Sequence, residues 1–192
     1  AITAATGVDA FVHCFEAYCA PGFHPMADGI ALEGMRLIKD NLLAAYMDGN
    51  NIVARANMMA ASTMGATAFQ KGLGAVHALA HPLGAIFDKH HGLLNAIILP
   101  YVIQKNRMEI SPKLENIARY LQLEDGSAES FVQWLLSWRE ALGIPNNLKD
   151  IGIAADNAKD IGQFAFADPS AAGNPIPLTA KDYSDVFRLA VG

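Results

Sequence analysis

Apolar residues recur at helical spacing along most of the chain. Between Pro25 and Met47 they return every three or four positions and would form one broad face of a helix. Turn-forming residues such as those at 48–51 separate this segment from the next one. No segment alternates convincingly between apolar and polar residues, so no strand is expected. The pattern predicts an all-α domain of eight or nine helices, over residues 8–20, 25–47, 52–69, 75–87, 93–106, 111–122, 127–143, 156–167 and 179–190.

Prolines mark several of the expected helix boundaries. Pro100 predicts a kink or an end within the segment 93–106. Ser111 followed by Pro112 has the form of an N-cap and first-turn pair, which predicts a new helix. The stretch 168–177 has the composition of a linker. A capping-box pattern follows it at Thr179 with an acidic residue three positions later, so we expect the stretch to lead into an ordered helix.

Composition and charge exclude several classes of protein. The chain has 192 residues, of which 52% are hydrophobic and 17% charged, which is enough for a core and too apolar for a disordered chain. The net charge of −5 and the lack of a basic run argue against a nucleic-acid partner. No uncharged stretch is long enough for a membrane span, and no signal peptide is visible. Two cysteines in a chain of this length do not make a disulfide scaffold, so we expect a reduced, cytoplasmic setting. Because the chain lacks an initiator Met, we also expect a piece of a longer protein.

The histidines carry the main chemical signal. Asp9 and His13 are four residues apart, so they share one face of a helix, and His77 and His81 have the same spacing. His91 follows His77 by 14 residues, which would span about 21 Å on a straight helix. If both histidines bind one ion, the chain must turn between them, and the polar run 88–92 offers that turn.

A site with one carboxylate and three imidazoles suits a divalent ion such as Fe²⁺ or Zn²⁺. Histidines on apolar helix faces are also common in ordinary cores, so the residues alone leave alternatives open. One alternative is a metallohydrolase, in which the ion activates water. Another is a helical interaction domain without a metal.

Three stretches of the sequence resemble a known family. They are Gly7-Val8-Asp9-Ala10-Phe11-Val12-His13 with the following Glu16-Ala17-Tyr18, the segment from Gly72 to Gly84, and the segment from His91 to Pro100. Along essentially its whole length the chain resembles the iron-containing (group III) alcohol dehydrogenases. This resemblance implies a two-domain, dehydroquinate synthase-like fold with an N-terminal nucleotide-binding domain. Residues 1–192 would be the C-terminal helical metal-binding domain, and the nucleotide-binding domain is absent from this chain.

The resemblance also implies roles for particular residues. The metal ligands would be Asp9, His13, His77 and His91, and His81 would lie near the nicotinamide and the substrate as a catalytic proton relay. The implied reaction is reversible hydride transfer between a small alcohol or aldehyde and NAD or NADP, with Fe²⁺ or alternatively Zn²⁺. We further expect a homo-oligomer, and an isolated chain without dehydrogenase activity. The alternative is a metal-binding or interaction domain that performs no redox chemistry.

Four residues near these motifs have simpler interpretations. We expect His90 to be an exposed turn residue and His24 to be a loop or helix-start residue. Cys14 is expected to be buried as a small apolar residue, and not to bridge Cys19 five positions later. Glu16 could support a metal ligand, although an ordinary polar contact is the favoured interpretation.

Overall fold

The computed structural model describes residues 2–192, and within them it is entirely helical, as the sequence predicted. Residues 2–192 form eight α-helices and four short 3₁₀ helices. The α-helices are α1 (Ile2–Cys19), α2 (Pro25–Met47), α3 (Ile52–Ala68), α4 (Ala75–Phe87), α5 (His91–Tyr120), α6 (Ala128–Ala141), α7 (Ala158–Ala167) and α8 (Ala180–Val191). The 3₁₀ helices are η1 (Phe69–Lys71), η2 (Lys149–Ile151), η3 (Ala155–Asn157) and η4 (Pro169–Gly173).

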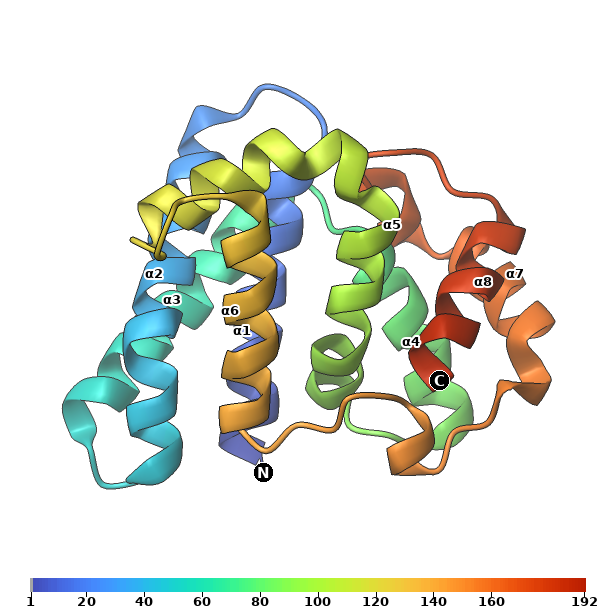
Figure 1. Cartoon of the computed structure of the whole chain (residues 1–192), viewed down its shortest axis with the longest axis horizontal. Helices are drawn as coiled ribbons and strands as arrows, with labels where there is room; N and C mark the ends of the chain where they lie inside the picture. The colour runs from blue at the N-terminus through green and yellow to red at the C-terminus, as the bar shows by residue number, and fades with distance from the viewer. Residues whose placement is uncertain (1) are drawn as a thin grey trace.

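Helix α5 joins two groups of helices. In the view of Figure 1, α1, α2, α3 and α6 lie on one side of its first half, and α4, α7 and α8 lie on the other. Helix α1 packs against α2, α3 and α5, while α4 packs against α5 and α7. The first half of α5 is therefore held between α1 and α4, and these three helices carry the acidic and histidine residues singled out above.

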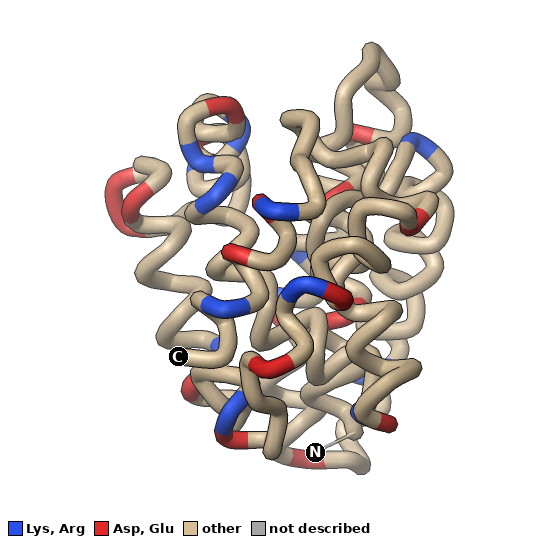
Figure 2. Tube along the Cα trace, turned by 90° about the vertical axis from the view of Figure 1, so that its right-hand side faces the viewer, with Lys and Arg blue, Asp and Glu red and all other residues tan. Residues whose placement is uncertain are grey.

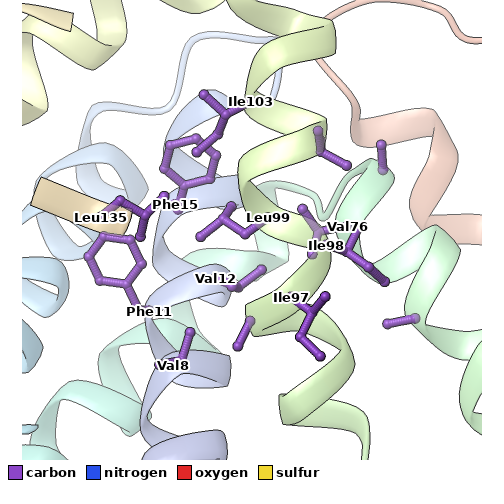
Figure 3. Packing of buried hydrophobic residues seen from close by; sticks show 14 of the residues in the cluster. Val8, Phe11, Val12, Phe15, Val76, Ile97, Ile98, Leu99, Ile103 and Leu135 are labelled. Atoms are coloured by element: carbon purple, nitrogen blue, oxygen red, sulfur yellow. The ribbon is translucent and has the colours of Figure 1, made fainter. Parts of the chain in front are cut away.

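The packing of α1 against α5 and α6 forms the centre of the core. Figure 3 shows Val12 and Phe15 of α1 close to Leu99 and Ile103 of α5. The ring of Phe11 is fully buried and lies 5.2 Å from the ring of Trp138 in α6, measured between centroids. Each fully buried apolar side chain of this size contributes about 1.5–3 kcal/mol to folding. These contacts fix the position of α1 relative to α5.

Helix α5 differs from the prediction of two helices at 93–106 and 111–122. It is continuous from His91 to Tyr120 and contains both Pro100 and Pro112, so Ser111 is not an N-cap. Figure 1 shows that the helix changes direction along its length instead of ending. A proline inside a helix removes one hydrogen bond and costs about 3 kcal/mol. Buried residues such as Ile110 and Leu114 lie on both sides of Pro112, and their packing offsets that cost.

Other helix boundaries agree more closely with the sequence. Helix α1 begins six residues before the expected start, but α2 begins at Pro25 as predicted, and the side chain of His24 caps it by accepting from the amide of Ala27 at 3.2 Å. The expected capping box of α8 is present, with Thr179 and Asp182 bonded reciprocally. The linker-like stretch 168–177 is ordered and includes η4.

Basic and acidic residues both occur along the described part of the chain. In Figure 2, segments with Lys or Arg and segments with Asp or Glu are interspersed along the trace. None of the helices between residues 2 and 192 is both long and apolar enough to cross a membrane.

Candidate metal centre

Helices α1 and α4 bring three potential metal ligands to one point. Asp9 and His13 project from the same face of α1, and His77 lies in the first turn of α4. Each of the three offers one ligand atom, and these atoms all lie within 4.8 Å of one another. The i, i+4 spacing of the first pair therefore has the geometric consequence that the sequence predicted.

His91 joins this group through the expected turn. Helix α4 ends at Phe87, Asp88 adopts a left-handed conformation with φ of 50°, and α5 starts at His91. The Nε2 atoms of His91 and His77 lie 3.6 and 3.7 Å from the same oxygen, Oδ1 of Asp9. We name these four residues the Asp9 cluster.

Glu16 fixes the orientation of His77. Its carboxylate is 4% exposed and accepts hydrogen bonds from the amides of Gly74 (3.0 Å) and Val76 (2.7 Å). Its Oε2 also lies 2.7 Å from Nδ1 of His77. Because an ionised carboxylate can only accept, this contact places the imidazole proton on Nδ1 and leaves Nε2 free for an ion. Of the two sequence interpretations of Glu16, this contact favours support of His77 over an ordinary polar contact.

Asn95 lies at the centre of the cluster and was not singled out from the sequence. It is fully buried, and its Nδ2 lies 2.6 Å from Oδ1 of Asp9, 3.0 Å from Nε2 of His91 and 3.3 Å from Nε2 of His77. Its own Oδ1 is buried without a hydrogen-bond partner. The only signal in the sequence is its position four residues after His91, on the same helix face.

The arrangement around Asn95 shows that the residues present fit a divalent ion. Oδ1 of Asp9 and the Nε2 atoms of His77 and His91 all face one donor, the Nδ2 amide group of Asn95. The same three acceptor atoms could surround a cation. The donor set of one oxygen and three nitrogens matches the ligands that Zn²⁺ and Fe²⁺ take in proteins. The unpartnered Oδ1 of Asn95 indicates that the amide is not fully satisfied in this state.

Burial favours the neutral, metal-binding form of two histidines of the cluster, His13 and His91. It is the largest influence on the pKa of His13 and of His91, and it lowers both. The Asp9 carboxylate acts in the opposite direction, and the nearby imidazoles lower both pKa values further. Lowered pKa values favour neutral imidazoles near pH 7, and metal binding requires the neutral form.

His81 lies beside the cluster, at its more exposed side. Its side chain is 44% exposed, and its ring centroid is 5.3 Å from that of His91 and 5.9 Å from that of His77. Its Nδ1 is 2.9 Å from Oδ2 of Asp168, a residue that the sequence did not identify. A hollow of about 380 Å³ adjoins this pair and is lined by His81, Pro82, Ala85, Ile86, Phe164 and Asp168.

The remaining chemically notable residues lie outside the cluster. Cys14 and Cys19 are both buried and unpaired, as expected. His90 is exposed at the N-cap position of α5, which agrees with its prediction as a turn residue.

Comparison with known proteins places this arrangement in a family. The chain is 39% identical to a 4-hydroxybutyrate dehydrogenase of Cupriavidus necator, over 99% of this chain and 52% of that protein. It is 36% identical to a 1,3-propanediol dehydrogenase of Citrobacter freundii, over 98% of this chain and 51% of that protein. The structure of an alcohol dehydrogenase from Oenococcus oeni superposes with a TM-score of 0.93 at 33% identity, over 98% of this chain and 51% of that one.

The chain thus spans about half the length of these relatives. Residues 3–191 match the family described as Fe-containing alcohol dehydrogenase, C-terminal. Together with the all-helical fold and the Asp/His cluster between α1, α4 and α5, this match shows that the chain belongs to the Fe-containing alcohol dehydrogenase family and corresponds to its C-terminal helical domain.

Proposed function

We propose that the chain holds one divalent metal ion through Asp9, His13, His77 and His91, in a protein that transfers a hydride reversibly between an alcohol and NAD or NADP. The observation that carries this proposal is the convergence of these four side chains from three helices. Membership of the family supports the choice of iron, and Zn²⁺ suits the same ligands.

The ion, when bound, supplies a Lewis acid that stabilises negative charge on the substrate oxygen. The protein contributes one negative charge through Asp9, so the centre keeps a net positive charge toward an anionic oxygen. Glu16 holds His77 in the orientation and tautomer that leaves Nε2 available. His81 is placed beside the cluster, where it can accept the proton that the alcohol releases.

The cofactor site is proposed to lie on a separate nucleotide-binding half. The relatives are about twice as long as this chain, and their names describe dehydrogenases of 4-hydroxybutyrate and 1,3-propanediol. Both names refer to short alcohols, which supports a small alcohol or aldehyde as the substrate class. The substrate would then bind between the two halves, against the exposed side of the cluster.

The ligand assignment is tested by metal analysis. The chain is loaded anaerobically with Fe²⁺ or with Zn²⁺, desalted, and measured by mass spectrometry for metal per chain. We expect about one ion in the wild type and in His90→Ala, a control next to a ligand, and a large loss in His77→Ala. Equal metal content in the wild type and His77→Ala would show that His77 is not a metal ligand.

The role of His81 separates the dehydrogenase from a metal-binding domain without redox activity. In the whole protein that contains both halves, His81→Ala should retain its metal but lose most alcohol-dependent NADH or NADPH formation. Loss of the metal would instead show that His81 is a ligand. A metal-loaded wild type that reduces neither cofactor with any short alcohol would favour the domain without redox activity.

A further inference from the structure

The contact between His81 and Asp168 joins two parts of the chain that are 87 residues apart. His81 lies in the second turn of α4, and Asp168 follows the last residue of α7. The two atoms in contact are Nδ1 of the imidazole and Oδ2 of the carboxylate, at 2.9 Å. Asp168 is the more buried partner, with a side chain that is 14% exposed.

The carboxylate of Asp168 is held in place by its own backbone surroundings. Its second oxygen, Oδ1, accepts from the amide of Ser170 at 2.8 Å and so caps η4. The segment after η4 is anchored by Asn174, which is buried and exchanges two hydrogen bonds with Asn106 of α5. These hydrogen bonds hold the carboxylate in one orientation, so Oδ2 faces His81 in a defined position.

The imidazole of His81 is held on a second side by the ring of His91. The two rings are nearly parallel, with an interplanar angle of 11°. The ring of His77 approaches at a steeper angle of 59°. The contact with Asp168 at the Nδ1 edge and the ring of His91 beside one face both favour this orientation of the His81 ring.

We propose that Asp168 is the positioning residue for His81: it accepts the hydrogen bond from Nδ1, keeps one proton there, and so leaves Nε2 unprotonated. This inference rests on the proposed function. During oxidation the O–H bond of the alcohol breaks, its proton moves to Nε2, and the imidazolium that forms keeps its Nδ1–H bond to Asp168. Proton return from Nε2 to the oxygen accompanies the reverse reaction.

The same arrangement occurs one helical turn earlier, which supports this interpretation. His77 also has its Nδ1 against a carboxylate from another helix, in that case Glu16. Helix α4 thus carries two histidines, four residues apart, whose Nδ1 atoms both face acceptors that cannot donate. Both contacts favour the tautomer in which Nε2 carries no proton. In the proposal, Nε2 of His77 binds the ion and Nε2 of His81 accepts the proton.

The chemistry of Asp168 suggests a discriminating substitution. The aspartate accepts two hydrogen bonds, one at each oxygen. An asparagine has a single acceptor oxygen, so in Asp168→Asn the NH₂ group must face either the Ser170 amide or Nδ1 of His81. Capping of η4 favours an orientation in which the amide oxygen still accepts from the Ser170 amide, as Oδ1 of Asp168 does. The NH₂ group then faces His81 and donates to its Nδ1. Because Nδ1 must now accept, the ring proton moves to Nε2.

Imidazole ¹⁵N NMR on the 192-residue chain at pH 8 tests this directly. The His81 signals are assigned by their loss in His81→Ala. We expect the Nδ1–H tautomer in the wild type, a shift toward the Nε2–H tautomer in Asp168→Asn, and recovery in Asp168→Glu if it folds. Asp160→Asn, the same change at an exposed position on α7, the helix before Asp168, is the matched control and should not alter the tautomer. A wild type in the Nε2–H form, or an unchanged tautomer in a folded Asp168→Asn, overturns the proposal.

Two further measurements separate this proposal from the proposed function. The zinc content of Asp168→Asn should equal that of the wild type, because Asp168 does not face the Asp9 cluster's ion position. In the whole protein, kcat for alcohol oxidation should fall about 10- to 100-fold with KM little changed. Loss of zinc, or a changed tautomer with unchanged kcat, would refute the positioning role. The NMR result stands even if the whole protein oxidises no alcohol.

Discussion

At the scale of single residues, the reactivity of the two buried thiols of α1, Cys14 and Cys19, measures how well this helix is packed. Burial raises the pKa of Cys14 and of Cys19 to about 12. A raised pKa leaves less thiolate at a given pH, roughly one molecule in ten thousand at pH 8, and the thiolate is the reactive form. We predict no reaction of the folded chain with a thiol-specific disulfide reagent at pH 8, and two reactive thiols per chain in guanidinium chloride. Rapid labelling of the folded chain would contradict the burial of α1.

Glu16 provides a second residue-scale prediction, for metal affinity. In Glu16→Gln the single amide oxygen cannot accept from the Gly74 amide, the Val76 amide and Nδ1 of His77 together. We expect Zn²⁺ affinity to fall about 10- to 100-fold, measured by competition with a chelator. Glu115→Gln, which removes a surface carboxylate and its ion pair with Arg119, should leave the affinity unchanged. Equal affinities in both variants would show that Glu16 does not orient His77.

Residue spacing alone, without the family resemblance, predicted only the local part of this site. The spacing of Asp9 and His13 follows from the helix period, so it could be inferred without a structure. The contacts of Glu16, Asn95 and Asp168 join residues that are 61, 86 and 87 positions apart. Such contacts depend on how α1, α4, α5 and α7 pack, which a one-dimensional pattern does not specify.

At the scale of helices, the close approach of α1 and α5 depends on Gly92, the residue after His91. A Cβ at Gly92 would overlap the carbonyl of Ala5 in α1 and lie 3.1 Å from the Cβ of Asp9. We predict that Gly92→Ala separates the two helices, lowers the free energy of unfolding by about 1–3 kcal/mol, and weakens metal binding. Chemical denaturation and the same zinc competition measure both effects.

Gly29 provides the matched control for this prediction. It is an exposed position within α2, and a Cβ there would meet nothing within 4 Å. Gly29→Ala should therefore raise the free energy of unfolding by about 0.5–1 kcal/mol through helix propensity. If Gly92→Ala behaved in the same way as Gly29→Ala, the helices would not need the glycine.

The helix boundaries show where pattern reasoning was sufficient and where it failed. The helix starts expected near His24 and at residue 127, and the capping box at Thr179, were correct because helix starts depend on neighbours in sequence. The division of α5 was wrong because Pro100 and Pro112 were treated as local signals. Their effect is overridden by tertiary packing of the buried residues around them.

At the scale of the whole molecule, apolar side chains are exposed beside the candidate site. Ile86 and Phe164 are 46% and 55% exposed and line the hollow next to His81. Exposed apolar surface around polar groups is typical of a binding face. In the proposed two-domain protein this face would be covered by substrate, cofactor and the nucleotide-binding half.

This leads to a prediction for the 192-residue chain alone. We expect it to be folded and helical by circular dichroism, because its apolar core is sufficient at this size. It should bind NADH no tighter than millimolar in a fluorescence titration and should not oxidise short alcohols after loading with Fe²⁺ or Zn²⁺. The physical reason is that a pyrophosphate requires a helix N-terminus or a glycine-rich loop aimed at it, and the proposed site for these lies on the other half. The whole two-domain protein, assayed in parallel, should bind NADH or NADPH at micromolar concentration. Micromolar cofactor binding or clear turnover by this chain alone would show that the division of labour between two domains is wrong.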